Sequence, residues 1–221
     1  MRLSRIYNPA QQKGRIIMKT LIVNFFAGPG AGKSTCAWQI ASALKKRGIN
    51  CEYVSEAAKD YVWDENFEML NGSVENQTKV YEEQKHRQDR LIGKVDVVVT
   101  DSPILLSTQY LKNPEQHPDF IKRIKSDFAA QDNFNIFIER SEKYQQAGRV
   151  QSAAEAKEID DKIKQMLDSE RQYYGTYRHD TVYKAVNNLI RTYHRINNTK
   201  AHSFGFNDES ELSNSDVEPE F

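Results

Sequence analysis

A glycine-rich segment between an apolar run and an amphipathic run constrains the fold of this 221-residue chain more than any other feature. Residues 27–35 read AGPGAGKST and fit the pattern GxxxxGK(S/T), with alanine in place of the first glycine. The preceding run, 20–26, is typical of a strand buried on both faces of a parallel sheet. Apolar residues at helical spacing follow the segment and end before Gly48. A strand, a glycine-rich turn and a helix in this order predict a loop that binds phosphate.

Each residue of the predicted loop has a role that its position sets. Gly30 and Gly32 let the backbone curl so that successive N–H groups point inward, toward the positive end of the following helix. Lys33 can bridge the β- and γ-phosphates of ATP, Ser34 can bind magnesium, and Thr35 can reach the α-phosphate. The predicted nucleotide-binding residues are Gly28, Pro29, Gly30, Ala31, Gly32, Lys33, Ser34 and Thr35. ATP and Mg²⁺ are therefore the expected cofactors.

Strands alternate with helices along the rest of the chain, which predicts a parallel sheet. Further strands are expected at 51–55, 96–100, 135–139 and 174–178, and further helices at 76–91, 120–130, 153–173 and 180–195. The predicted architecture is an α/β three-layer sandwich of the P-loop NTPase type. It has a parallel sheet of about five strands flanked by helices, and a small lid.

The two ends of the chain differ from this single predicted domain, which spans residues 18–196. Residues 1–17 are polar and irregular, and Met18 directly precedes the first strand. We therefore expect a leader that does not belong to the fold, with Met18 as the natural start. Residues 197–221 form an expected disordered tail, because their charges are almost all acidic and apolar residues are sparse.

The composition of the chain argues against several classes of function. The 31 basic and 31 acidic residues cancel, so the chain lacks the overall positive field that attracts nucleic acid or anionic membranes. Cys36 and Cys51 have no metal-like spacing and are expected to be small core residues in a reducing compartment. No apolar run approaches the roughly 18 residues of a membrane span. These features predict a cytoplasmic protein without a membrane partner.

Two acidic residues stand where predicted strands end. Asp101 follows a valine-rich strand, where a carboxylate can reach magnesium or the hydroxyl of an acceptor, although it could also cap the next helix. Glu56 follows the second strand and can bind or deprotonate an acceptor hydroxyl, although a solvated helix start would look similar. The sequence thus predicts carboxylates beside the phosphate-binding loop.

Polar and cationic residues elsewhere are candidates for substrate contacts. Gln84 and Arg87 share one face of a predicted helix and could hold a base, a sugar or a phosphate of the substrate. Arg140 and Arg149 fit cations on a mobile lid, at about 140–152, that closes over the phosphates. Ordinary surface arginines are the alternative.

Several segments together resemble a known family, the small-molecule P-loop kinases. These are FAGPGAGKST, EYVSEAAKD at 52–60, VVVTDSPIL at 97–105, and ERSEKYQQAGRVQ at 139–151 followed by EID at 158–160. Within that family, these segments resemble the nicotinamide riboside kinase domain of bacterial NAD-regulator proteins and ATP-binding proteins of bacterial viruses. The resemblance spans about 18–195.

This resemblance implies transfer of the ATP γ-phosphate to a small nucleoside-like acceptor, with Asp101 and Glu56 near the acceptor and Arg149 on the lid. The predicted catalytic residues are Lys33, Glu56, Asp101, Arg140 and Arg149. Two alternatives stay open: a kinase that acts on DNA or RNA, and a regulatory ATPase without a dedicated acceptor. Neither a guanine-selecting NKxD segment nor an LSGGQ signature is present in the sequence.

Overall fold

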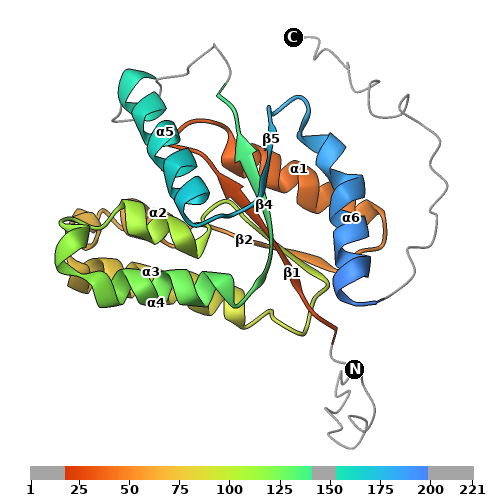
Figure 1. Ribbon diagram of the computed structural model, residues 1–221, viewed down its shortest axis with the longest axis horizontal. Coiled ribbons are helices and arrows are strands. Elements are labelled where there is room, and N and C mark those ends of the chain that lie inside the picture. Colours follow the sequence, from red (N-terminus) through yellow and green to blue (C-terminus); the bar gives the residue numbers. More distant parts are fainter. Residues whose placement is uncertain (1–17, 141–152, 199–221) are drawn as a thin grey trace, which may run out of the picture.

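The computed structural model describes residues 18–140 and 153–198, and its centre is a parallel sheet of five strands. The strand order is β2-β3-β1-β4-β5, with helices on both faces (Figure 1). The predicted three-layer α/β fold is confirmed. The strands are β1 (Leu21–Phe26), β2 (Cys51–Val54), β3 (Val97–Thr100), β4 (Asp132–Ile138) and β5 (Tyr174–Tyr177).

Two groups of helices cover the two faces of the sheet (Figure 1). One face carries α1 (Lys33–Lys46) and α6 (Ala185–Ile196). The other carries α3 (Val74–Asp89), α4 (Pro118–Ala129) and α5 (Ala153–Ser169). The shorter elements are helix α2 (Ala58–Trp63) and the 3-10 helices η2 (Phe67–Leu70), η3 (Ile104–Gln109), η4 (Pro114–Gln116) and η5 (Val182–Lys184).

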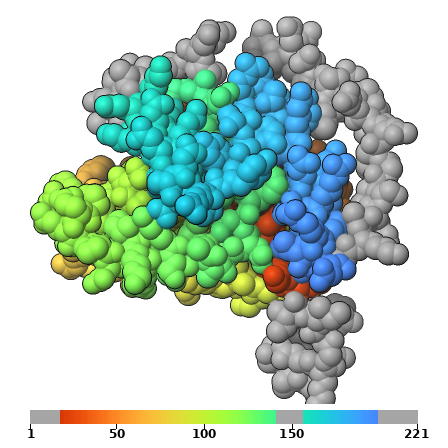
Figure 2. All heavy atoms as spheres, in the orientation of Figure 1, coloured from red at the N-terminus to blue at the C-terminus, as the bar shows by residue number. Residues whose placement is uncertain are grey.

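Strand β1 lies in the middle of the sheet and separates two apolar cores. Val23 and Phe25 pack toward α1 and α6, while Phe26 packs toward α4 and α5. Every residue of the strand is buried, as an apolar run of this kind predicts. In Figure 2 only small red areas, from the segment that contains β1, remain visible between the green and blue parts of the molecule. Such burial stabilises the fold by about 25 cal/mol per Å² of apolar surface.

The two predicted core cysteines lie in the first of these cores. Cys36 and Cys51 are buried and form no disulfide. Burial raises the pKa of Cys36 to about 11 and that of Cys51 to about 12. Both thiols are therefore uncharged near neutral pH and act as small apolar side chains.

The strand register brings the predicted functional segments to one edge of the sheet. Asn24 of β1 lies beside Thr100 of β3, and Thr100 lies beside Val54 of β2. The three strands are parallel, so their carboxyl ends lie at the same edge of the sheet, with β1 extending two residues further to Phe26. The loop after β1, Asp101 after β3 and Glu56 after β2 consequently meet in the crevice where α/β sheets bind ligands.

Four of the helices and strands differ from the sequence prediction, and one of them is α6, which begins at Ala185, five residues later than predicted. Strand β4 begins at Asp132, three residues earlier than predicted. Two of the three extra residues, Asp132 and Asn133, are polar, but Asn24 Nδ2 donates hydrogen bonds to Asn133 Oδ1 (2.8 Å) and to Asn135 Oδ1 (3.1 Å), so these amide oxygens are paired inside the sheet. Helix α5 ends at Ser169, four residues early, and α2 was not predicted.

Some predictions concern residues outside the described ranges. These are the leader 1–17, the lid residues 141–152 with Arg149, and the tail beyond residue 198. In the described part of the chain, none of the helices is long and apolar enough to cross a membrane.

Candidate active site

The glycine-rich loop joins β1 to α1 and takes a shape that favours glycine at three positions. Gly30 and Gly32 have φ values of 77° and 87°, in the left-handed region that side chains rarely adopt. A Cβ atom on Gly28 would lie 2.9 Å from both the carbonyl oxygen of Ala156 and Oδ1 of Asp160. The three glycines thus allow the loop to curl in front of the helix and to lie against α5.

Lys33 is the first residue of α1 and folds back beneath the loop. Its Nζ donates hydrogen bonds to the carbonyl oxygens of Ala27 (2.8 Å) and Gly28 (3.1 Å). Burial lowers the pKa of Lys33, while the negative charges of Glu56 and Asp101 act in the opposite direction. The side chain of Ala27, which replaces the first glycine of the motif, is fully buried, so the alanine is accommodated without exposing apolar surface.

Asp101 and Ser34 form the centre of the site. Asp101 is 1% exposed, and its Oδ2 accepts a hydrogen bond from Ser34 Oγ. Its other oxygen, Oδ1, is buried and has no hydrogen-bond partner among the described residues. Burial raises the pKa of Tyr53 above its usual range, and the charge of Asp101 adds to this effect. A buried carboxylate oxygen without a partner suits a bound cation.

Magnesium fits this pair of residues, provided that phosphate oxygens complete its shell. Ser34 Oγ and an Asp101 oxygen are the hard oxygen ligands that Mg²⁺ prefers. Residues 18–140 and 153–198 contain no group of three or more His, Cys, Asp or Glu side chains that could hold a metal alone. Ser34 and Asp101 would therefore hold Mg²⁺ together with a nucleotide, and the ion would neutralise charge on the phosphates.

Lys59 connects the two predicted carboxylates. Its Nζ lies 3.4 Å from Asp101 Oδ2, 3.6 Å from Glu56 Oε2 and 3.2 Å from Ser34 Oγ. Glu56 is therefore part of the same charged cluster as Asp101. Lys59 was not predicted to have a role, because the spacing of residues around it in the sequence does not show that its side chain reaches the end of another strand.

Gln84 and Arg87 lie on α3 and contact the segment that follows Glu56. Gln84 is 3% exposed, and its Oε1 accepts a hydrogen bond from the backbone N–H of Ala57 at 2.8 Å. Arg87 forms ion pairs with Asp60 and, at 2.8 Å, with Glu83. These contacts fasten the start of α2 to α3 and so hold the segment that follows Glu56.

Arg140 contacts the outer side of the phosphate-binding loop. Its Nη1 donates to the carbonyl oxygen of Pro29 at 2.7 Å, and its Nε donates to Asp160 Oδ2 at 2.9 Å. Asp160 in turn accepts a hydrogen bond from the Gly28 N–H at 2.5 Å. Arg140 and Asp160 thus clamp the loop to α5. Asp160 was not predicted to have a role of its own, although it lies in one of the segments that carry the family resemblance.

This clamp leads to a prediction about stability. Asp160→Asn removes the carboxylate that the Arg140 guanidinium, 14% exposed, and the Gly28 N–H share, and should reduce the free energy of unfolding by about 1–3 kcal/mol. Urea denaturation would measure the loss. The matched control is Asp161→Asn, because Asp161 is the exposed neighbour on α5 and should change stability by less than about 0.5 kcal/mol. Equal effects of the two substitutions would contradict the clamp.

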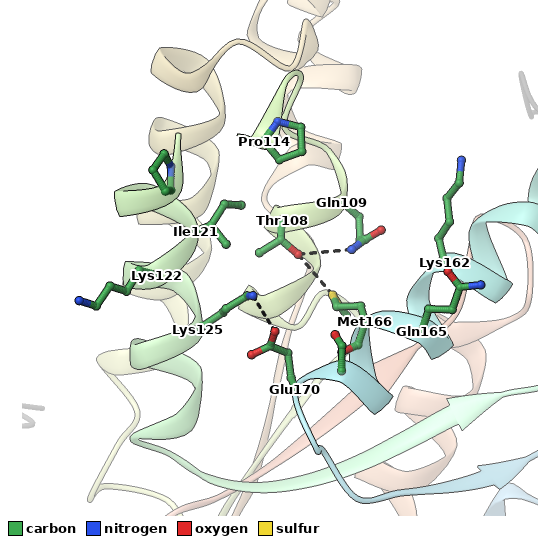
Figure 3. Close-up of a pocket in the computed structure, with 12 residues that line it drawn as sticks. Thr108, Gln109, Pro114, Ile121, Lys122, Lys125, Lys162, Gln165, Met166 and Glu170 are labelled. Atoms are coloured by element: carbon green, nitrogen blue, oxygen red, sulfur yellow. Dashed lines mark hydrogen bonds and ion pairs between the residues drawn. The ribbon is translucent and has the colours of Figure 1, made fainter. Parts of the chain in front are cut away.

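The described residues also form a groove away from this site. It has a volume of about 840 Å³ and lies between α4, α5 and the segment 108–118 (Figure 3). Lys125 forms an ion pair with Glu170 at 2.6 Å across it, and Lys122 and Lys162 lie at its sides. The residues that line the groove include none from the glycine-rich loop. The groove is therefore separate from the candidate active site.

The sheet order, the glycine-rich loop and the Ser34–Asp101 pair define a nucleotide-binding protein of the P-loop NTPase fold. A family model described as an AAA domain matches residues 22–181, which is most of the chain. The protein therefore belongs to this AAA domain family. A comparison with curated protein sequences gives no significant match.

Comparison with solved structures agrees on the fold. The chain is similar to NadR protein in complex with NR, with a TM-score of 0.57 and 14% identity over 86% of this chain. That match spans 55% of the NadR chain, so this protein corresponds to about half of it. A more distant match is the APS kinase CysC of Mycobacterium tuberculosis in complex with AMPPNP and APS, with a TM-score of 0.42 and 14% identity over 79% of this chain and 97% of that one. Another is shikimate kinase from Bacteroides thetaiotaomicron, with a TM-score of 0.36 and 13% identity over 78% of this chain and 96% of that one. The resemblance to proteins of bacterial viruses stays a prediction.

Proposed function

We propose that this protein is an ATP-dependent kinase that transfers the γ-phosphate to a nucleoside, a nucleotide or a related small metabolite. The supporting observation is the position of two carboxylates beside the phosphate-binding loop. Asp101 Oδ2 and Glu56 Oε2 lie 3.4 and 3.6 Å from one atom, Lys59 Nζ. A kinase needs one carboxylate for magnesium and a second for the acceptor hydroxyl, at the edge where the γ-phosphate arrives. The NadR structure contains NR, which agrees with a small molecule as the acceptor.

Each residue then has a role in the transfer. Lys33 and the metal held by Ser34 and Asp101 would neutralise charge on the transferring phosphoryl group. Glu56 would accept the proton of the acceptor hydroxyl as that oxygen forms its bond to the γ-phosphorus and the bond to the leaving ADP breaks. Arg149 is the proposed lid cation.

Three further residues would act mainly by positioning these groups. Arg140 would hold the phosphate-binding loop through Pro29 and Asp160. Gln84 and Arg87 would support acceptor binding indirectly, by fixing the segment that carries Glu56.

The deciding experiment is transfer of label from [γ-³²P]ATP to separate panels of nucleosides, nucleotides and oligonucleotides, with Lys33→Ala as the blank. Label on a small molecule supports the proposal. Label on an oligonucleotide, with tight and strongly salt-dependent binding, would favour a nucleic-acid kinase instead. Release of phosphate that no acceptor stimulates would favour a regulatory ATPase.

Glu56→Gln is expected to separate acceptor chemistry from nucleotide binding. The substitution removes the proposed base but keeps the size of the side chain, so turnover should fall about 100-fold. The dissociation constant for Mg·ATP should change less than about threefold, since the loop and its metal residues are intact. Steady-state kinetics and calorimetry would measure the two quantities. Full turnover in Glu56→Gln would remove Glu56 from the proposed mechanism.

A further inference from the structure

Lys59 makes the most unusual contacts of the described site. It extends from α2, follows Glu56 by three residues, and reaches Asp101 and Ser34 on two other elements. Ser34 and Asp101 are the two residues that would hold Mg²⁺. The ammonium group of Lys59 therefore contacts, at Ser34 Oγ and Asp101 Oδ2, the same two side chains that would hold the metal ion.

Two cations in these positions would repel each other strongly, because little separates them and Asp101 is shielded from water. Of the groups involved, Lys59 is the one that can move. Its side chain is 45% exposed, whereas that of Asp101 is 1% exposed and fixed at the end of a central strand. Helix α2 contains no buried residue, so the lysine stem is not held by a core.

We propose that Lys59 is a built-in counter-ion that competes with Mg²⁺ for Ser34 and Asp101. In the metal-free protein, the ammonium group balances the charge of a buried carboxylate, which is costly to leave unpaired. When the magnesium–nucleotide complex arrives, Lys59 swings toward solvent and stays beside Glu56. This inference rests on the proposed nucleotide site, and it adds a residue that sets how much magnesium the site requires.

Lys59→Met tests the competition without measuring turnover. The full-length protein would be mixed with the β,γ-imido analogue of ATP, and its thermal unfolding midpoint would be recorded against Mg²⁺ concentration. Removing the competitor should lower the half-saturating Mg²⁺ concentration about fivefold, the upper range for an ion pair of this exposure. In EDTA without nucleotide, the variant should unfold at a lower temperature than the wild type, because Asp101 loses its counter-charge.

Two control variants make the result specific. Lys45→Met removes a lysine that pairs with Glu52 at 3.0 Å on the surface, and it should leave the half-saturating Mg²⁺ concentration unchanged. Lys59→Arg keeps the positive charge and should behave like the wild type. If Lys59→Met proves too unstable, Lys59→Gln removes the same charge with a polar side chain and carries the same expectation.

The outcomes separate this inference from the proposed function. If the half-saturating Mg²⁺ concentration of Lys59→Met were unchanged or raised, the proposed competition would be wrong, even if phosphoryl transfer to an acceptor is observed. A half-saturating Mg²⁺ concentration that is fivefold lower would support the competition, even if the wild type phosphorylated no acceptor. In that second case, only the kinase proposal would fail.

Discussion

Lys33→Ala is expected to reduce phosphoryl transfer about 1,000-fold. The ammonium group lies beneath the phosphate-binding loop, where it contacts two carbonyl oxygens and can turn toward the β- and γ-phosphates. A buried cation aimed at developing charge contributes about 4 kcal/mol to the transition state, and each 1.4 kcal/mol corresponds to a factor of ten. Steady-state kinetics at saturating acceptor would measure the loss.

The matched control for this prediction is Lys46→Ala. Lys46 is exposed at the far end of the same helix, so its removal should alter turnover less than twofold. Urea denaturation of both variants would show whether lost activity reflects unfolding. If folded Lys33→Ala protein transferred phosphate at the wild-type rate, the loop would not be the nucleotide site, and the proposed function would fail with it.

The order of elements could be predicted because local signals marked most of them. Apolar runs identified the strands, and Gly48 marked the end of α1, where its φ of 75° allows the turn. The end of α5 was missed for the opposite reason. Arg171 takes the same left-handed position, with φ of 52°, and the N–H groups of Arg171 and Gln172 bond to the carbonyl oxygens of Asp168 and Leu167. An arginine gives no such signal in the sequence.

The early start of β4 shows a second limit of sequence patterns. The residues 132–135 read DNFN and resemble a loop by composition. Their amides are paired with Asn24, which lies more than 100 residues earlier in the chain. Asn133 also donates to the nearby carbonyl oxygens of Phe128 and Gln131, as a loop residue could, so only the pairing with β1 identifies the segment as part of the sheet.

The residues of the candidate site also fall into those that the sequence could predict and those that it could not. The loop and Asp101 could be predicted, because a motif and the end of a strand fix their positions. Lys59 and Asp160 could not be assigned, because each acts through a contact between distant segments: Lys59 with Asp101, and Asp160 with Gly28. Arg140 was expected on a lid, and its contacts with Pro29 and Asp160 were not predicted.

Asp101→Asn should have an effect as large as that of Lys33→Ala, with a different signature. The amide has the size of the carboxylate but lacks its charge, so the fold is kept while the proposed magnesium site loses its anionic ligand. Turnover should fall about 1,000-fold, since a metal ion contributes several kcal/mol to phosphoryl transfer. The magnesium concentration needed for half-maximal rate should rise, whereas ATP binding in EDTA should persist, because one negative charge near the phosphates is removed.

Calorimetry in EDTA and kinetics across a magnesium series would measure both, with Asp161→Asn as the control on the exposed side of α5. An unchanged magnesium dependence in Asp101→Asn would show that the ion is held elsewhere.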